Sequence, residues 1–98
     1  MSVTAYSGNL NENVSSGTVI VDFWADWCSP CKALNPVLED ISNTTDINVV
    51  KVNIDEHQDL AKEYQVRSIP TMVVFRDGQV STRIVGYKAK DEILTIIG

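Results

Sequence analysis

The stretch VDFWADWCSPCK, residues 21–32, decides how this chain folds. It joins an apolar run, of the kind that forms a buried strand, to two cysteines, Cys28 and Cys31, that are separated by two residues. A carboxylate, Asp22, stands in the middle of the apolar run, where burying its charge is costly. The stretch therefore raises the question of what a buried acid does a few residues before a cysteine pair.

Secondary structure can be predicted on both sides of the cysteines. Residues 18–25 are nearly continuous in apolar side chains, which is typical of a strand that is covered on both faces. After the cysteines, apolar residues at positions 34, 37, 38 and 41 follow the i, i+3, i+4, i+7 spacing of one helix face. Pro36 lies inside this helix and should kink its axis.

The rest of the chain continues to alternate strands with helices. Asp55 and Gln58 fit a capping pattern at a helix start. Asp77-Gly78 is a strong hairpin signal, so the strand after it should return antiparallel. The expected strands are residues 2–6, 47–54, 71–75 and 80–85, and the expected helices are a short one within 8–16, one after 55, and 90–97. This order predicts a single α/β domain, residues 1–98, with a central mixed sheet and helices on both of its faces.

Composition excludes some classes of function. The chain has 98 residues and a net charge of −5, so it offers no basic stripe for nucleic acid. No apolar run approaches the roughly 18 residues that are needed to span a bilayer. The first 17 residues contain neither a basic residue nor an apolar block. We therefore expect no signal peptide, no membrane association and a cytosolic location.

The cysteine pair lies where a strand ends and a helix begins. The unpaired N–H groups and the dipole of a helix start favour a thiolate at Cys28. Pro30 suits the first helical turn, where its missing N–H costs nothing. Cys31 lies on the same helix face, within reach of a disulfide. Cys28 is therefore expected to be the exposed nucleophile, and Cys31 the more buried thiol that resolves the intermediate.

A metal site and a structural disulfide are weaker interpretations of the pair. A structural zinc needs four ligands, usually two such pairs, and this chain has one pair and one histidine, His57. A purely structural disulfide would gain little by closing so short a loop. Redox chemistry is thus the favoured interpretation, with no metal. For Asp22 the residues alone leave two roles open: it takes a proton from a cysteine, or local hydrogen bonds satisfy it.

The ordered motifs of the whole chain resemble the thioredoxin family. The segment FWADWCSPCK is similar to that family's active site, usually W-C-G-P-C-K. The further matches are Asp22, Pro36, KVNID at 51–55, SIPT at 68–71, DG at 77–78 and VGY at 85–87. The resemblance implies the thioredoxin fold, with sheet order 1-3-2-4-5. It implies a protein-disulfide reductase that binds no cofactor beyond its own redox-active Cys28–Cys31 pair.

The resemblance also implies roles for residues outside the pair. Asp22 would assist Cys31 as a proton acceptor, and Lys51 matches the lysine that pairs with this acid. Pro70 would follow Ile69 in a cis peptide bond beside the cysteines, which leaves the Ile69 backbone free to bind an extended substrate. Trp27 should be exposed beside the sulfur. Gly86 should let a partner's backbone approach, although a bulge would also need glycine.

Departures from the family pattern affect the redox properties and the choice of partner. Ser29 replaces the usual glycine, and with Pro30 it would contact substrate. Ser68 and Gln65 replace glycines near the expected docking surface. Oxidants and isomerases of the family tend to carry histidine between the cysteines, so its absence favours a reductant. The implied partners are protein disulfides and a thioredoxin reductase that regenerates the dithiol of a monomer. The rival hypotheses are a docking module with incidental cysteines and a disulfide oxidase or isomerase.

Overall fold

A computed structural model of the chain describes residues 2–98. Its strands are β1 (Val3–Ala5), β2 (Thr18–Trp24), β3 (Asn48–Asn53), β4 (Thr71–Arg76) and β5 (Gln79–Val85). Its helices are α1 (Leu10–Val14), α2 (Ser29–Thr44), α3 (Gln58–Glu63) and α4 (Lys90–Ile97). The predicted order of elements is confirmed, with bounds that shift by a residue or two.

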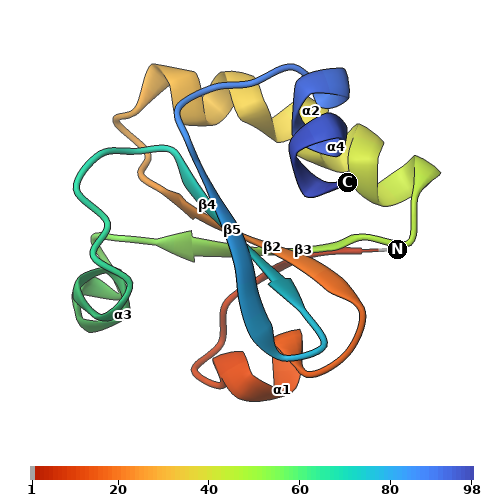
Figure 1. Cartoon of the computed structure of the whole chain (residues 1–98). Helices are drawn as coiled ribbons and strands as arrows, with labels where there is room; N and C mark the ends of the chain where they lie inside the picture. Colours follow the sequence, from red (N-terminus) through yellow and green to blue (C-terminus); the bar gives the residue numbers. More distant parts are fainter. Residues whose placement is uncertain (1) are drawn as a thin grey trace.

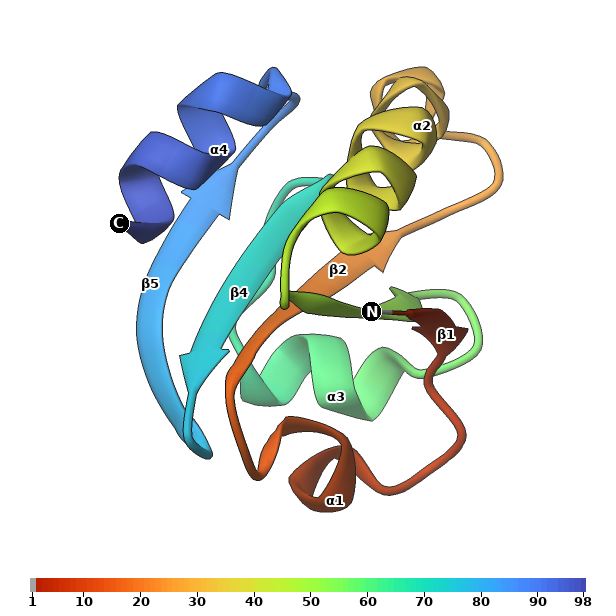
Figure 2. The same ribbon diagram turned by 90° about the vertical axis from the view of Figure 1, so that its right-hand side faces the viewer.

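The five strands form one mixed sheet in the order β1-β3-β2-β4-β5. β3 pairs parallel with both β1 and β2, whereas β4 pairs antiparallel with β2 and β5. Helices α2 and α4 cover one face of the sheet, and α1 and α3 cover the other (Figures 1 and 2). This is the thioredoxin fold that the resemblance implies.

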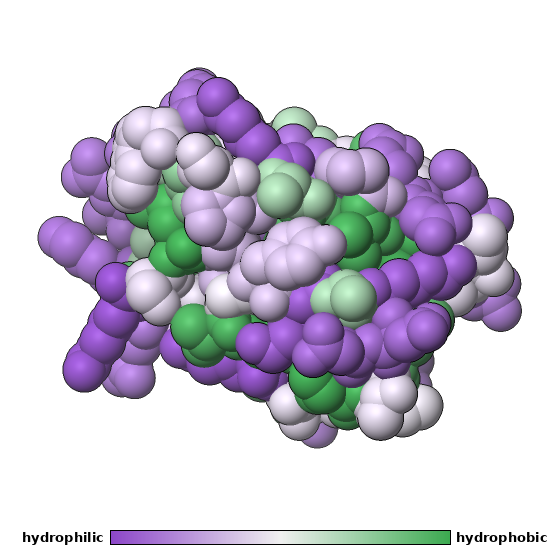
Figure 3. Space-filling model, turned by 90° about the horizontal axis from the view of Figure 1, so that it is seen from above, coloured by the Kyte–Doolittle hydropathy of each residue, from purple (hydrophilic) through white to green (hydrophobic). Residues whose placement is uncertain are grey.

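Strand β2 is central to the core because its apolar side chains pack on both faces of the sheet. Ile20 packs in the core beneath α2 and α4, while Val21 and Phe23 pack in the core toward α1 and α3. Alternation along the strand places Asp22 on the same face as Ile20, where its Cα partners are Lys51 of β3 and Met72 of β4. The outer side of α2 and α4 is mainly hydrophilic, with small separate apolar patches (Figure 3).

The hairpin and the last helix form as predicted. Asp77 and Gly78 both have positive φ angles, 50° and 88°, as a two-residue turn between antiparallel strands requires. Helix α4 lacks a side-chain cap at Ala89, but the Glu92 carboxylate accepts the Ala89 N–H at 3.3 Å. Helix α2 runs through Pro36 without ending.

The predicted capping of α3 by Asp55 and Gln58 is wrong. Residues 54–56 form a turn in which the N–H groups of Glu56 and His57 both donate to the Asn53 carbonyl. This turn delays the helix, so its N-cap is His57, which makes no side-chain cap bond. The Asp55 carboxylate does not cap the helix, and it accepts the indole N–H of Trp27 instead.

Candidate active site

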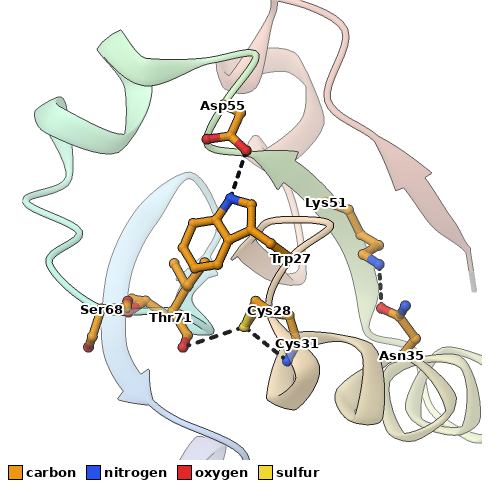
Figure 4. Close-up of a disulfide and its surroundings, with 9 residues drawn as sticks. Trp27, Cys28, Cys31, Asn35, Lys51, Asp55, Ser68 and Thr71 are labelled. Atoms are coloured by element: carbon orange, nitrogen blue, oxygen red, sulfur yellow. Dashed lines mark hydrogen bonds between the residues drawn. A yellow bond between two sulfur atoms is a disulfide. The ribbon is translucent and has the colours of Figure 1, made fainter.

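The two cysteines form a disulfide at the start of α2, with their Cα atoms 5.3 Å apart. Cys28 is the N-cap of the helix, and its backbone is extended. Its Sγ accepts the backbone N–H of Cys31 at 3.2 Å (Figure 4). A free helix N–H aimed at Sγ stabilises negative charge there, which is what a reactive thiolate at Cys28 needs.

Both sulfur-bearing residues are well covered. Cys28 is 6% exposed and Cys31 is 1% exposed. The order agrees with the expectation that Cys31 is the more buried, but Cys28 is far less exposed than predicted. The cover comes from Ala25 and from the half-buried side chains of Trp24, Ile54 and Ile69. Cys28 therefore lies within a small apolar cluster.

The loop before β4 lies against the cysteines. The Ile69–Pro70 peptide bond is cis, and the carbonyl oxygen of Ile69 lies 3.8 Å from Cys28 Sγ. Gly86, with φ at +89°, donates its N–H to the Pro70 carbonyl at 2.8 Å. The shift in register between β4 and β5 lies at Val74 and Phe75, so a bulge does not explain Gly86. The structure thus brings residues 69, 70 and 86 together beside Cys28.

Exposed apolar side chains flank this site. Trp27 is 68% exposed, and Val85 and Tyr87 are the exposed neighbours of Gly86. The indole Nε1–H of Trp27 donates to Asp55 Oδ2 at 3.0 Å, which orients the ring beside Cys28 (Figure 4). Sequence reasoning missed this role of Asp55, because the misplaced cap assigned its carboxylate to the helix. Ser29 and Pro30 are exposed in the first turn of α2.

Asp22 is completely buried, and neither of its carboxylate oxygens has a hydrogen-bond partner within residues 2–98. Burial raises the pKa of Asp22 from 3.8 to about 7, while the positive charge of Lys51 acts in the opposite direction. A carboxyl with this pKa can accept a proton near neutral pH.

Lys51 lies on the same face of the sheet as Asp22, yet its ammonium binds elsewhere. Nζ donates to Asn35 Oδ1 of α2 (Figure 4). It also lies 4.5 Å from the ring centroid of Trp24. The direct pairing of Lys51 with Asp22 that the resemblance implies is therefore not formed here. Trp24 is half-buried, with its ring beneath this ammonium. Asn35 was not a predicted site residue, and only its position one turn after Cys31 could have indicated it.

The described part of the chain offers neither a metal site nor a membrane span. Between residues 2 and 98, no three side chains of His, Cys, Asp or Glu gather in a way that could hold a metal ion. Over the same residues, no helix is both long enough and apolar enough to cross a membrane.

Comparison with known proteins agrees with this geometry. The family model described as Thioredoxin matches residues 2–98. A thioredoxin of Staphylococcus saprophyticus is 39% identical over 97% of this chain and 93% of its own length. A thioredoxin of Chlamydia caviae is 44% identical over 91% of this chain and 88% of its own length.

A solved structure gives the same result. A mutant thioredoxin from Halobacterium salinarum is 38% identical and superposes with a TM-score of 0.90, covering 97% of this chain and 87% of its own. Family, fold and a C-x-x-C pair at disulfide distance all point to one chemistry. The chain therefore belongs to the thioredoxin family and is a thiol–disulfide oxidoreductase that reduces protein disulfides.

Proposed function

We propose that the reduced chain works through two successive thiol–disulfide exchanges. The Cys28 thiolate attacks one sulfur of a target disulfide, and the second target sulfur leaves as a thiolate. Cys31 then loses its proton to Asp22, directly or through a water, and attacks Cys28 Sγ. The mixed disulfide breaks, the target leaves with both sulfurs reduced, and the chain keeps the Cys28–Cys31 disulfide. Two electrons pass from the pair to the target.

The observation that carries this proposal is the position of Cys28 as the N-cap of α2. Its Sγ accepts a backbone N–H of the helix, whereas Cys31 lies inside the first turn and is almost fully buried. Only one of the two sulfurs therefore has the electrostatic environment of an activated nucleophile.

An extended segment of a target protein fits the surface around Cys28. The backbone of Ile69 precedes the cis bond to Pro70, and Gly86 lies beside it with no side chain to block a strand. Backbone pairing with such a segment gives affinity without demanding a sequence. Trp27 supplies an apolar platform, and Ser29 and Pro30 complete the surface at the helix start.

The family also suggests the surroundings in which the chain works. A thioredoxin reductase would return the disulfide to the dithiol, and the chain would act as a cytoplasmic monomer. No cofactor is required, because the exchange uses only the sulfurs of Cys28, Cys31 and the target. The family match over residues 2–98 supports treating the chain as one domain.

Trapping of the intermediate tests the order of the two cysteines. Cys31→Ser should accumulate a mixed disulfide with a disulfide-containing protein such as insulin, because the resolving thiol is absent. Cys28→Ser should accumulate none, since the buried Cys31 is a poor nucleophile. Non-reducing electrophoresis with peptide mapping detects the adduct. The reverse pattern, with an adduct on Cys31, would contradict the assignment.

A further inference from the structure

Lys51 and Asp22 are placed as though they should form an ion pair. They are Cα partners across the parallel pairing of β2 with β3, and both project toward the side of the sheet that α2 covers. Opposite charges in such adjacent positions normally attract. In this structure the Lys51 ammonium instead donates to Asn35 and lies over the ring of Trp24.

The two partners of the ammonium are both neutral. Asn35 offers an amide oxygen from the second turn of α2, one turn after Cys31, and Trp24 offers the face of its indole. Together they hold the ammonium without neutralising its charge. Asp22 is left completely buried, with no hydrogen-bond partner for either oxygen among residues 2–98, which is the costlier arrangement for an acid.

We infer that Asn35 is a positioning residue that holds the Lys51 ammonium against Trp24 and so keeps the Asp22 carboxyl unpaired. The inference rests on the proposed function, in which Asp22 accepts the proton of Cys31. In this role Asn35 acts through Lys51, whose ammonium its amide oxygen accepts.

Keeping Asp22 unpaired suits its proposed task. An acid is most useful as a base when its pKa lies near the working pH, and burial brings the pKa of Asp22 to about 7. An ammonium bound directly to the carboxylate would pull the pKa back toward its ordinary value. The resulting carboxylate would be a weak proton acceptor for Cys31.

Few further charged groups can interfere with this arrangement. From β4 the Cα partner of Asp22 is the apolar Met72, and the cysteines of α2 do not titrate while they form a disulfide. Lys51 and Trp24 line a cavity of about 210 Å³ with Tyr6, Glu56 and His57. Glu56 is therefore the charged rival of Asn35 for the ammonium.

The titration of Asp22 in the oxidised protein tests the inference. The carboxyl carbon is followed by NMR in protein labelled with ¹³C-aspartate and is assigned by its loss in Asp22→Asn. In Asn35→Ala the ammonium is released and should turn to Asp22. The midpoint should fall by roughly one pH unit or more, the effect of an opposite charge within 4–6 Å. Asn35→Leu, which also lacks the acceptor, should give the same fall and serves if the alanine variant folds poorly.

Three controls make the result specific. Asn43→Ala, the same substitution at an exposed position of α2, should leave the Asp22 midpoint in place. In a Lys51→Met background the midpoint should start higher, and Asn35→Ala should then change nothing. Glu56→Gln should also leave it in place.

The inference would be overturned if Asn35→Ala left the Asp22 midpoint unchanged. It would also be overturned if Asn35→Ala lowered that midpoint equally in the Lys51→Met background, where no ammonium is present. If Glu56→Gln lowered the Asp22 midpoint as much as Asn35→Ala does, Glu56 would be the residue that holds the Lys51 ammonium away from Asp22. None of these measurements needs turnover, so a failure of the disulfide reductase function is seen separately, in a disulfide reduction assay.

Discussion

Asp22 is the residue with the clearest thermodynamic signature in the chain. An acid whose pKa rises on folding holds its proton more tightly in the folded state than in the unfolded state. Between about pH 4 and pH 7 the folded chain therefore binds more protons, and the free energy of unfolding falls as the pH rises. The stabilising contribution of the protonated acid is complete below about pH 4 and is lost as the pH rises through about 7.

Replacement of Asp22 by asparagine should remove this dependence. The unfolding free energy of Asp22→Asn, relative to the wild type, should rise across this pH range by an amount on the order of 4 kcal/mol. Chemical denaturation of the oxidised proteins at a series of pH values measures it. Ile20→Val, on the same face of β2, should instead lower stability by about 1 kcal/mol at every pH. If the free energies of unfolding of Asp22→Asn and the wild type changed with pH in parallel, the description of Asp22 as a buried acid without a partner would be contradicted.

The same substitution probes the proton transfer. Asp22→Asn should slow the resolution of the mixed disulfide by Cys31, by roughly 10²-fold if general base catalysis is lost. It should slow the first attack by Cys28 much less, because that sulfur is already activated by the helix start. Stopped-flow measurement of tryptophan fluorescence, to which Trp24 and Trp27 both contribute, can separate the two steps. Equal slowing of both would argue against Asp22 as the base.

At the scale of the elements, the end of α3 shows what one departure from the family pattern costs. Gln65 follows the helix in the left-handed region, with φ at +54°, where a family glycine would be unstrained. The two carbonyls at this end, Tyr64 and Gln65, are both bound by the guanidinium of Arg83. Both carbonyls at the end of α3 are therefore hydrogen-bonded, although Gln65 is poorly suited to the left-handed conformation.

Gln65→Gly should stabilise the chain. A side chain in the left-handed region costs about 1–2 kcal/mol. The greater freedom of glycine in the unfolded chain offsets part of this gain, about 0.4–1 kcal/mol. We expect a net gain of about 0.5–1 kcal/mol in urea denaturation. Gln58→Gly, in the first turn of the same helix, should instead be destabilising. A lower free energy of unfolding in Gln65→Gly would contradict backbone strain at Gln65.

Across the whole molecule, the β4–β5 hairpin fixes helices on both faces of the sheet. Arg83 of β5 binds the end of α3, and Arg76 of β4 binds the carbonyls of Ile97 and Gly98 at the end of α4. One hairpin thus holds the last turn of a helix on each side. These bonds tie the helices to the sheet across up to 22 residues of sequence.

Loss of either arginine should loosen one helix and leave the second in place. Arg83→Met and Arg76→Met should each cost about 1 kcal/mol of stability. Arg83→Met should speed hydrogen exchange at the Val66 amide, which donates to the Ala61 carbonyl, and Arg76→Met should not. Arg67→Met is the control, since this side chain is exposed in the loop after α3. Equal protection of Val66 in all three variants would contradict the role of Arg83.

The order of elements could be predicted from the sequence because each element depends on local patterns. The apolar run of β2 and the Asp77-Gly78 turn are examples. Which strands are neighbours is not a local property, and it came from resemblance to a family. The Lys51–Asn35 and Trp27–Asp55 bonds could not be predicted, because each needs the final distance between side chains on different elements. The prediction of a cap at Asp55 was wrong because the backbone turn over residues 54–56 moves the start of the helix to Gln58.

The initial rate of insulin disulfide reduction at pH 7, with dithiothreitol as electron donor, tests the central claim most directly. The wild-type chain should accelerate the reduction well above the rate of dithiothreitol alone, because Cys28 attacks and Cys31 resolves. The double variant Cys28→Ser, Cys31→Ser should return the rate to that of dithiothreitol alone. A wild-type rate no higher than the dithiothreitol rate, or a double variant as fast as the wild type, would contradict a disulfide reductase.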